Sequence, residues 1–148
     1  MKIRSDALVG VALDWFVAQC ESVKTYGPED FREQRKHVTK NGEYVFRWHQ
    51  SWQQTGPLID REHIDLCWAQ GTDTWCAYMS SDRHDRLLEI DGPTALVAAC
   101  RCFVVARLGD EVEVPPGLLH EGEVIGVASD GTDIFWKADQ GLAVACTA

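Results

Sequence analysis

The chain has 148 residues, of which 45% are hydrophobic and 25% are charged, and its formal net charge at pH 7 is −9. These values are ordinary for a soluble globular protein, and the length suits one domain with one core. The excess negative charge disfavours nucleic acid and anionic membrane surfaces, because both would repel the chain. We therefore expect neither as a partner.

The amino-terminal segment lacks the features of a secretion signal. Its apolar run is interrupted by Asp14, and no small-residue cleavage site follows. No stretch approaches the roughly 18 consecutive apolar residues that are needed to span a bilayer. We therefore expect a cytosolic protein in which the six cysteines stay reduced. Because these cysteines show no C-x-x-C spacing and no nearby histidine cluster, we expect no metal site and no cofactor.

The first predicted element is a helix over residues 6–21. Leu8 and Ala12 recur at helical spacing, and further apolar residues widen the same face. Asp14 is the only charge in the interior of this segment. It has two interpretations, a carboxylate on a solvated face or a partner for a buried arginine such as Arg101.

The composition changes over residues 22–42, which contain a Gly-Pro pair, a cluster of basic side chains and an Asn-Gly pair. We interpret this segment as a loop with one helical turn near residues 28–35. Its basic cluster is either part of a solvated loop or an anion site, and the sequence leaves both open. The chain then continues with a predicted strand at 43–48, an irregular segment at 49–56 and a short edge strand at 57–64.

A β-hairpin is predicted in the middle of the chain. Its strands are residues 65–69 and 74–79, and the Gln-Gly-Thr-Asp segment between them has the composition of a turn. A charged loop follows, and residues 87–90 form a further short strand.

The most apolar segment is a predicted helix over residues 92–109. Its only interior charges are Arg101 and Arg107, so we expect a buried helix on which a sheet packs. Pro93 suits the first helical position, and the hydroxyl of Thr94 can accept a hydrogen bond from the first turn. The final glycine suits the end of the helix.

The carboxyl-terminal part predicts a second hairpin. Residues 123–128 and 133–138 flank an Asp-Gly turn, and residues 142–146 form a closing strand. The sequence thus predicts an α+β fold, in which an antiparallel sheet of about five to six strands packs on the central helix (92–109) beside the amino-terminal helix (6–21).

We divide the chain into an α+β domain over residues 1–118 and a hairpin extension of the same domain over residues 119–148. Two nearly apolar helices leave more apolar surface than one thin sheet can cover. We therefore also expect a homodimer or higher homo-oligomer that buries part of the first helix.

The chain contains six tryptophans, an unusual number for its length. Four of them lie beside predicted turns, where an indole either packs the end of a sheet or forms a stacking wall for a planar ligand. A nearby arginine can donate charge-assisted hydrogen bonds to a phosphate. No motif of nucleophilic or acid–base catalysis is recognised, so we assign no catalytic residue. The candidate ligand-binding residues are Trp48, Trp52, Gly56, Pro57, Arg61, Trp68, Trp75 and Arg101.

Three segments carry a family resemblance, namely Leu13-Asp14-Trp15, WQQTGPLIDREHI at 52–64 and GPTALVAACRCFV at 92–104. They resemble the L-D-W, W-x-x-G-G-P-I-I-E-x-E-x-I and G-P-T-x-L-x-A-A-M-R-C patterns of the NinX-like family of small tailed-phage and prophage proteins. The resemblance covers residues 1–20 and 48–118, and it departs from the pattern at Thr55 and Asp60. It implies a phage accessory protein in the cytoplasm of a bacterial host, and it implies no known activity or catalytic residue.

The tryptophans beside turns and the nearby arginines predict a non-catalytic binder of a small nucleotide-type ligand. By analogy with other small phage proteins, such a binder sequesters a nucleotide signal of a bacterial defence system. Two alternatives stay open. One is a protein interaction module that inhibits or redirects a host protein, and the other is a hydrolase of a nucleotide signal that uses Asp60, Glu62 or His63.

Overall fold

The structure is a computed structural model, and it describes residues 2–22, 27–34, 47–81, 85, 87–137 and 142–145. This part of the chain contains both helices and antiparallel strands, largely in separate runs, which confirms the predicted α+β class. The helices are α1 (Gly10–Cys20), α2 (Pro28–Gln34), α3 (Trp52–Glu62) and α4 (Ala95–Leu108), with a 3-10 turn, η1, at Ser5–Ala7. The strands are β1 (Lys2–Arg4), β2 (Asp65–Ala69), β3 (Thr74–Met79), β4 (Leu88–Gly92), β5 (Glu111–Glu113), β6 (Val124–Val127), β7 (Asp133–Lys137) and β8 (Leu142–Ala145).

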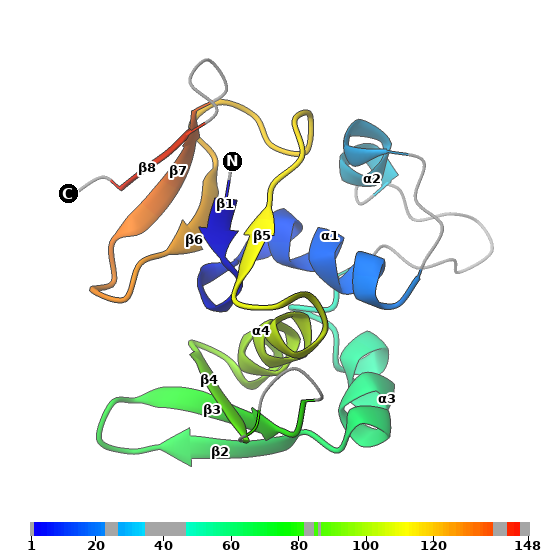
Figure 1. Ribbon diagram of the computed structural model, residues 1–148, viewed down its shortest axis with the longest axis vertical. Helices are drawn as coiled ribbons and strands as arrows, with labels where there is room; N and C mark the ends of the chain where they lie inside the picture. The colour runs from blue at the N-terminus through cyan, green and yellow to red at the C-terminus, as the bar shows by residue number, and fades with distance from the viewer. Residues whose placement is uncertain are drawn as a thin grey trace.

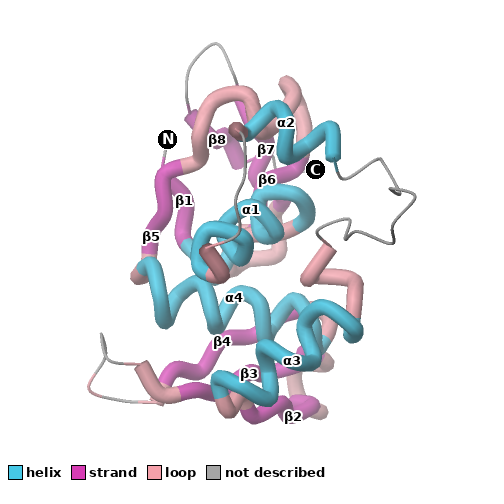
Figure 2. The backbone as a smooth tube through the Cα atoms, turned by 90° about the vertical axis from the view of Figure 1, so that its right-hand side faces the viewer, coloured by secondary structure: helices cyan, strands magenta, loops and turns pink. Residues whose placement is uncertain are grey.

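Helix α4 lies at the centre of the molecule (Figure 1). The β2–β3–β4 sheet covers one side of α4, and α1 crosses the other side (Figures 1 and 2). The β1–β5 pair and the β6–β7–β8 sheet lie on the same side of α4 as α1, away from the β2–β3–β4 sheet (Figure 1). The described strands are therefore divided among three sheets, where the sequence predicted one. Both predicted hairpins, β2–β3 and β6–β7, are present.

The central helix forms as predicted, because both of its ends have suitable residues. The Thr94 hydroxyl accepts a hydrogen bond from the Val97 N–H at 3.1 Å, and Gly109 ends the helix with φ 94°. Pro93 lies just before the capping residue and not at the first helical position. Twelve of the fourteen residues of α4 are buried, as expected for so apolar a helix.

The first helix begins later than predicted. The segment before Gly10 is extended apart from the 3-10 turn η1, because much of its backbone pairs with distant strands. Strand β1 pairs with β5, and the Val9 N–H donates to the Ile125 carbonyl at 3.2 Å. These long-range partners replace the first helical turn that was predicted at residue 6.

Helix α3 contradicts the prediction of an irregular segment at 49–56 and an edge strand at 57–64. The Ser51 hydroxyl accepts a hydrogen bond from the Gln54 N–H at 3.2 Å, which caps the amino terminus of the helix. His63, at φ 54°, ends it in the left-handed conformation. Gly56 and Pro57 therefore lie inside a helix and do not form a turn.

Two predictions concern the long segment before α3. The helical turn near residues 28–35 is confirmed, since α2 spans Pro28–Gln34. Most of the predicted strand at 43–48 lies outside the described residues, and Trp48 at its end lies in a turn.

One hydrophobic core joins these elements, and it extends along the chain from Ile3 to Trp136. Eight of the eleven residues of α1 are buried within the single chain, against α4, α2 and β6. The dimer was predicted because the first helix was expected to leave apolar surface uncovered, and the fold does not support that reason. The dimer itself stays a prediction. No helix of the described residues is long and apolar enough to cross a membrane.

Candidate functional site

A cleft of about 1,010 Å³ opens where three segments of the chain meet. Residues of β1 and η1 form one side, residues 91–93 at the end of β4 and just after it form the second, and residues of the β6–β7 hairpin around its turn form the third. Binding sites for small molecules commonly measure about 300–1,000 Å³. The cleft is therefore large enough for a molecule of nucleotide size.

Arg101 lines this cleft from α4, and only 6% of its surface is exposed. Its Nε donates to the Leu8 carbonyl oxygen at 2.9 Å, and its Nη1 donates to the Asp91 carbonyl oxygen at 3.0 Å. Among the described residues, Arg101 hydrogen-bonds carbonyl oxygens and forms no ion pair with a carboxylate. Burial lowers the pKa of Arg101, because the charged form is poorly solvated there, whereas the negative charges of Asp91 and Asp6 act in the opposite direction. An anion in the cleft would add to the compensation that these two carboxylates give.

The charges around Arg101 make the cleft locally positive. Lys2, Arg4 and Arg101 line it together with two carboxylates, those of Asp6 and Asp91, in a chain whose net charge is −9. Arg4 donates two hydrogen bonds to Asp6, at 3.1 and 3.0 Å, and these bonds raise the pKa of Arg4. Among the described residues that line the cleft, Lys2 and Arg101 are therefore the cations that remain for a ligand.

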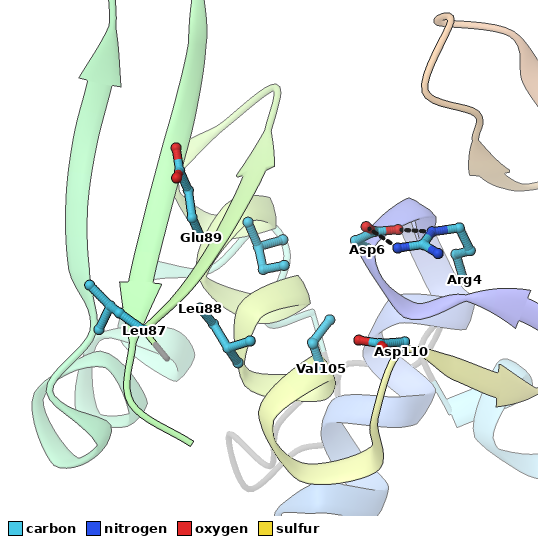
Figure 3. A pocket seen from close by; sticks show the side chains of 8 residues that line it. Arg4, Asp6, Leu87, Leu88, Glu89, Val105 and Asp110 are labelled. Carbon is cyan, nitrogen blue, oxygen red and sulfur yellow. Dashed lines mark hydrogen bonds and ion pairs between the residues drawn. The ribbon is translucent and has the colours of Figure 1, made fainter. Parts of the chain in front are cut away.

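A smaller pocket of about 320 Å³ shares Arg4 and Asp6 with the cleft (Figure 3). Glu89 and Asp110 line it as well, among apolar side chains of β4 and α4. Among the described residues that line it, the one cation is Arg4, which is bound to Asp6, as the dashed lines in Figure 3 show. The described lining of this pocket is therefore acidic, which disfavours a phosphate.

The four candidate tryptophans do not form one wall. Trp48 is buried in the core, whereas Trp52, the first residue of α3, is 58% exposed. Trp68 and Trp75 face each other across β2 and β3 with ring centroids 5.6 Å apart, and the turn of this hairpin points away from α3 (Figure 1). None of the four is among the described residues that line the cleft.

The remaining candidates lie on α3. Arg61 is half-exposed and donates to the carboxylates of Glu21 and Glu62, and the bond to Glu21 above all raises the pKa of Arg61. Its charge is thus already compensated. Gly56 and Pro57 lie in the same helix. Arg101 is therefore the one predicted residue that lines the cleft, and a binding role for the others stays a prediction.

Sequence reasoning missed the partner of Asp14. This carboxylate is fully buried, and it accepts a hydrogen bond from the backbone N–H of His49 at 3.1 Å. Its second oxygen lies 2.7 Å from His49 Nδ1. The interpretation as a solvated face is therefore wrong, and Arg101, the suggested buried arginine, hydrogen-bonds carbonyl oxygens instead. A lone charge in so apolar a helix did indicate a buried partner, but nothing in the sequence identified His49.

The comparisons with known proteins identify a family over the amino-terminal two thirds of the chain. The sequence profile of the family described as Bacteriophage P22, NinX matches residues 4–107. No curated protein matches the chain. Arg101 and residues 91–93 lie inside the matched range, whereas the β6–β7 turn lies outside it. The cleft is thus built from matched and unmatched parts of the chain.

Proposed function

The chain belongs to the bacteriophage P22 NinX family, as its motifs predicted, and from this premise we propose that it is a phage accessory protein that binds a small phosphate-bearing ligand without converting it. The observation that carries the proposal is Arg101, a buried cation on the wall of a cleft with no carboxylate bound to it among the described residues. A phosphate brings negative charge next to Arg101 and accepts the charge-assisted hydrogen bonds that a guanidinium donates.

Size and local charge support a nucleotide-type ligand. A cleft of about 1,010 Å³ accommodates a nucleoside with its phosphates, and Lys2 of β1 adds a second cation to its lining. Because no tryptophan is among the described lining residues, the phosphates and not the base carry most of the recognition. We expect the ligand to be a nucleotide signal of a bacterial defence system, sequestered in the host cytoplasm.

Isothermal titration calorimetry with cyclic nucleotides and ADP-ribose tests this proposal. We expect saturable heat with at least one of these compounds and at least a tenfold loss of affinity, about 1.4 kcal/mol, in Lys2→Ala combined with Arg101→Gln. Arg107→Ala is the matched control, since Arg107 is half-exposed and paired with Glu62 outside the cleft. The absence of heat with every compound, or equal affinity in parent and double variant, would contradict the proposal.

The exposed tryptophans favour a second candidate, a module that binds a host protein. Trp52 and Trp68 are large apolar side chains at the surface, and Trp68 is 43% exposed. Such residues commonly anchor protein interfaces. Under this candidate, Trp52→Ala abolishes co-purification of a bacterial protein and leaves ligand heat unchanged.

The hydrolase alternative has less support. The carboxylate of Glu62 accepts hydrogen bonds from Arg61 and Arg107, and His63 ends α3 in a left-handed conformation. Glu62 is therefore engaged in surface ion pairs. Undiminished nucleotide turnover in Glu62→Gln would remove this residue from any catalytic role.

A further inference from the structure

Two cysteines face each other across neighbouring strands of the β2–β3–β4 sheet. Cys67 of β2 lies directly opposite Cys76 of β3 in the antiparallel register. Both are free thiols, and Cys67 is exposed. Ala77 and Met79 of β3 belong to the hydrophobic core, and successive side chains of a strand point to opposite faces. The two cysteines therefore lie on the outer face of the sheet, which is turned away from α4.

The register places the two residues within the range of a disulfide bond. Directly opposed residues of antiparallel strands have Cα atoms about 4.5 or 5.5 Å apart, depending on their hydrogen bonding. Disulfides commonly span Cα distances of about 4.4–6.8 Å. We infer that Cys67 and Cys76 form a site of oxidative modification, at which a low-molecular-weight disulfide such as oxidised glutathione links the two sulfurs to each other.

The reaction is two successive thiol–disulfide exchanges. The Cys67 thiolate attacks one sulfur of oxidised glutathione, the glutathione S–S bond breaks, and one glutathione leaves as thiolate. The Cys76 thiolate then attacks Sγ of Cys67, and the second glutathione leaves. The two cysteines are oxidised to one disulfide, the glutathione disulfide is reduced to two thiols, and the two protons of the cysteines pass to the departing thiolates.

Exposure determines which cysteine reacts first. Cys67 is accessible to glutathione, whereas Cys76 is buried by its neighbours on the sheet. Burial raises the pKa of Cys76, and the facing groups Glu89 and Asp91 of β4 and Cys67 of β2 raise it further, against a hydrogen bond with Tyr78. Closure by Cys76 is therefore slower at neutral pH than at alkaline pH, because the thiolate is the nucleophile.

The remaining described cysteines serve as internal controls. Cys100 and Cys102 are fully buried in α4, and Cys20 is half-buried at the end of α1. Burial raises the pKa of Cys102 and of Cys20 to about 12, so both thiols stay protonated. None of the three has the combination of exposure and an opposed thiol that Cys67 has.

Alkylation of the unfolded chain after oxidation tests the inference. The reduced full-length protein is incubated with oxidised glutathione, and its free thiols are then alkylated in denaturant and counted by intact-mass spectrometry. We expect the number of alkylated cysteines to fall by two from six, with a peptide map that links Cys67 to Cys76. A different linked pair, or a mixed disulfide on Cys67 that never closes at any pH, would overturn it.

Single serine variants separate the two steps. Cys76→Ser should stop the reaction at the mixed disulfide of Cys67 with glutathione. Cys67→Ser, which changes an exposed side chain, should remove both products. Cys20→Ser is the matched control and should close as the parent does. Closure in Cys67→Ser, or loss of closure in Cys20→Ser, would also overturn the inference.

Discussion

At the scale of single residues, Arg101 stabilises the fold as well as the cleft. Its guanidinium donates to the carbonyl oxygens of Leu8 and Asp91, which belong to segments that precede α1 and α4. A third, longer bond of 3.5 Å goes to the Ala7 carbonyl oxygen. Removing the donor takes one hydrogen bond from each of these carbonyl groups, at a cost of about 1–3 kcal/mol for each that is left unpaired and that water cannot reach. We expect Arg101→Met to lower the free energy of unfolding by about 2 kcal/mol, measured by urea denaturation.

Arg107→Ala is the control for this measurement. Arg107 comes from the same helix, but its side chain is half-exposed and bonds Glu62 at 2.6 Å on the surface. An exposed pair of this kind contributes about 1 kcal/mol or less. Equal losses in the two variants would contradict a structural role for Arg101.

The buried pair of Asp14 and His49 makes a second prediction at this scale. The two side chains meet at 2.7 Å, and the carboxylate is fully buried. We expect a double-mutant cycle of Asp14→Ala and His49→Ala to give a coupling free energy of about 0.5–3 kcal/mol in urea denaturation. A parallel cycle of Asp14→Ala with His63→Ala, on another element, should be additive within about 0.5 kcal/mol. Additivity in the first cycle would show that the pair does not couple.

At the scale of elements, two glycines predict different effects of the same substitution. A Cβ added at Gly92 would lie 2.6 Å from the backbone nitrogen of Ala98, because the end of β4 contacts the first turn of α4. Gly56 lies inside α3, and no atom beyond its two chain neighbours would meet its Cβ within 4 Å, but Pro57 directly follows it and disfavours a helical backbone at a residue with a Cβ. We expect Gly92→Ala to cost about 1–3 kcal/mol, whereas at Gly56 the helix propensity of alanine and the clash with Pro57 offset each other to within about 1 kcal/mol. Thermal unfolding of both variants checks this, and an equal loss of stability in the two would refute it.

The same two elements show how far the sequence predicts local structure. Helix α4 was predicted to within a few residues, because Thr94 and Gly109 provide local end signals and the residues between them are apolar. Helix α3 was missed, because Gly56-Pro57 resembles a turn. The overlooked signal was Ser51 followed three residues later by Gln54, a pattern typical of helix amino termini. Helical caps act locally and can be read from sequence.

At the scale of the whole molecule, the partners of the strands are set by contacts far apart in the chain. Strand β1 pairs with β5, with Ile3 opposite Val112, and no local pattern identifies such a partner. The hairpins, whose strands are joined by short turns, were predicted correctly. The cleft could not be predicted for the same reason, since its three sides come from the two ends and the middle of the chain.

The predicted dimer also belongs to this scale. Burial of α1 between two chains no longer supports it, since α1 is buried within one chain. Apolar surface is nevertheless exposed at Trp52, Leu87, Trp68 and Leu108. We expect light scattering coupled to gel filtration to give twice the mass of one chain, and Trp52→Ala to weaken this association if α3 carries it. A parent mass equal to one chain at micromolar concentration would remove the prediction.

The carboxyl-terminal sheet decides whether the chain divides at residue 118. Ile125 and Trp136 belong to the same core as α1, and the Val9 N–H donates to the Ile125 carbonyl. Truncation to residues 1–118 removes both buried side chains and the partner of Val9. Replacing one large buried aromatic residue by alanine costs about 3–5 kcal/mol, against a total stability of about 5–15 kcal/mol for a typical domain. We therefore expect the truncated chain to lose its near-ultraviolet circular dichroism and its cooperative unfolding transition.

Point variants test the same contribution without removing a segment. Trp136→Ala should lower the free energy of unfolding by about 3–5 kcal/mol, while Trp52→Ala, which changes an exposed indole, should leave it within about 0.5 kcal/mol. A truncated chain that unfolds with the parent's midpoint would show that residues 119–148 are dispensable for folding, and that the cleft gains its third side from an independent appendage.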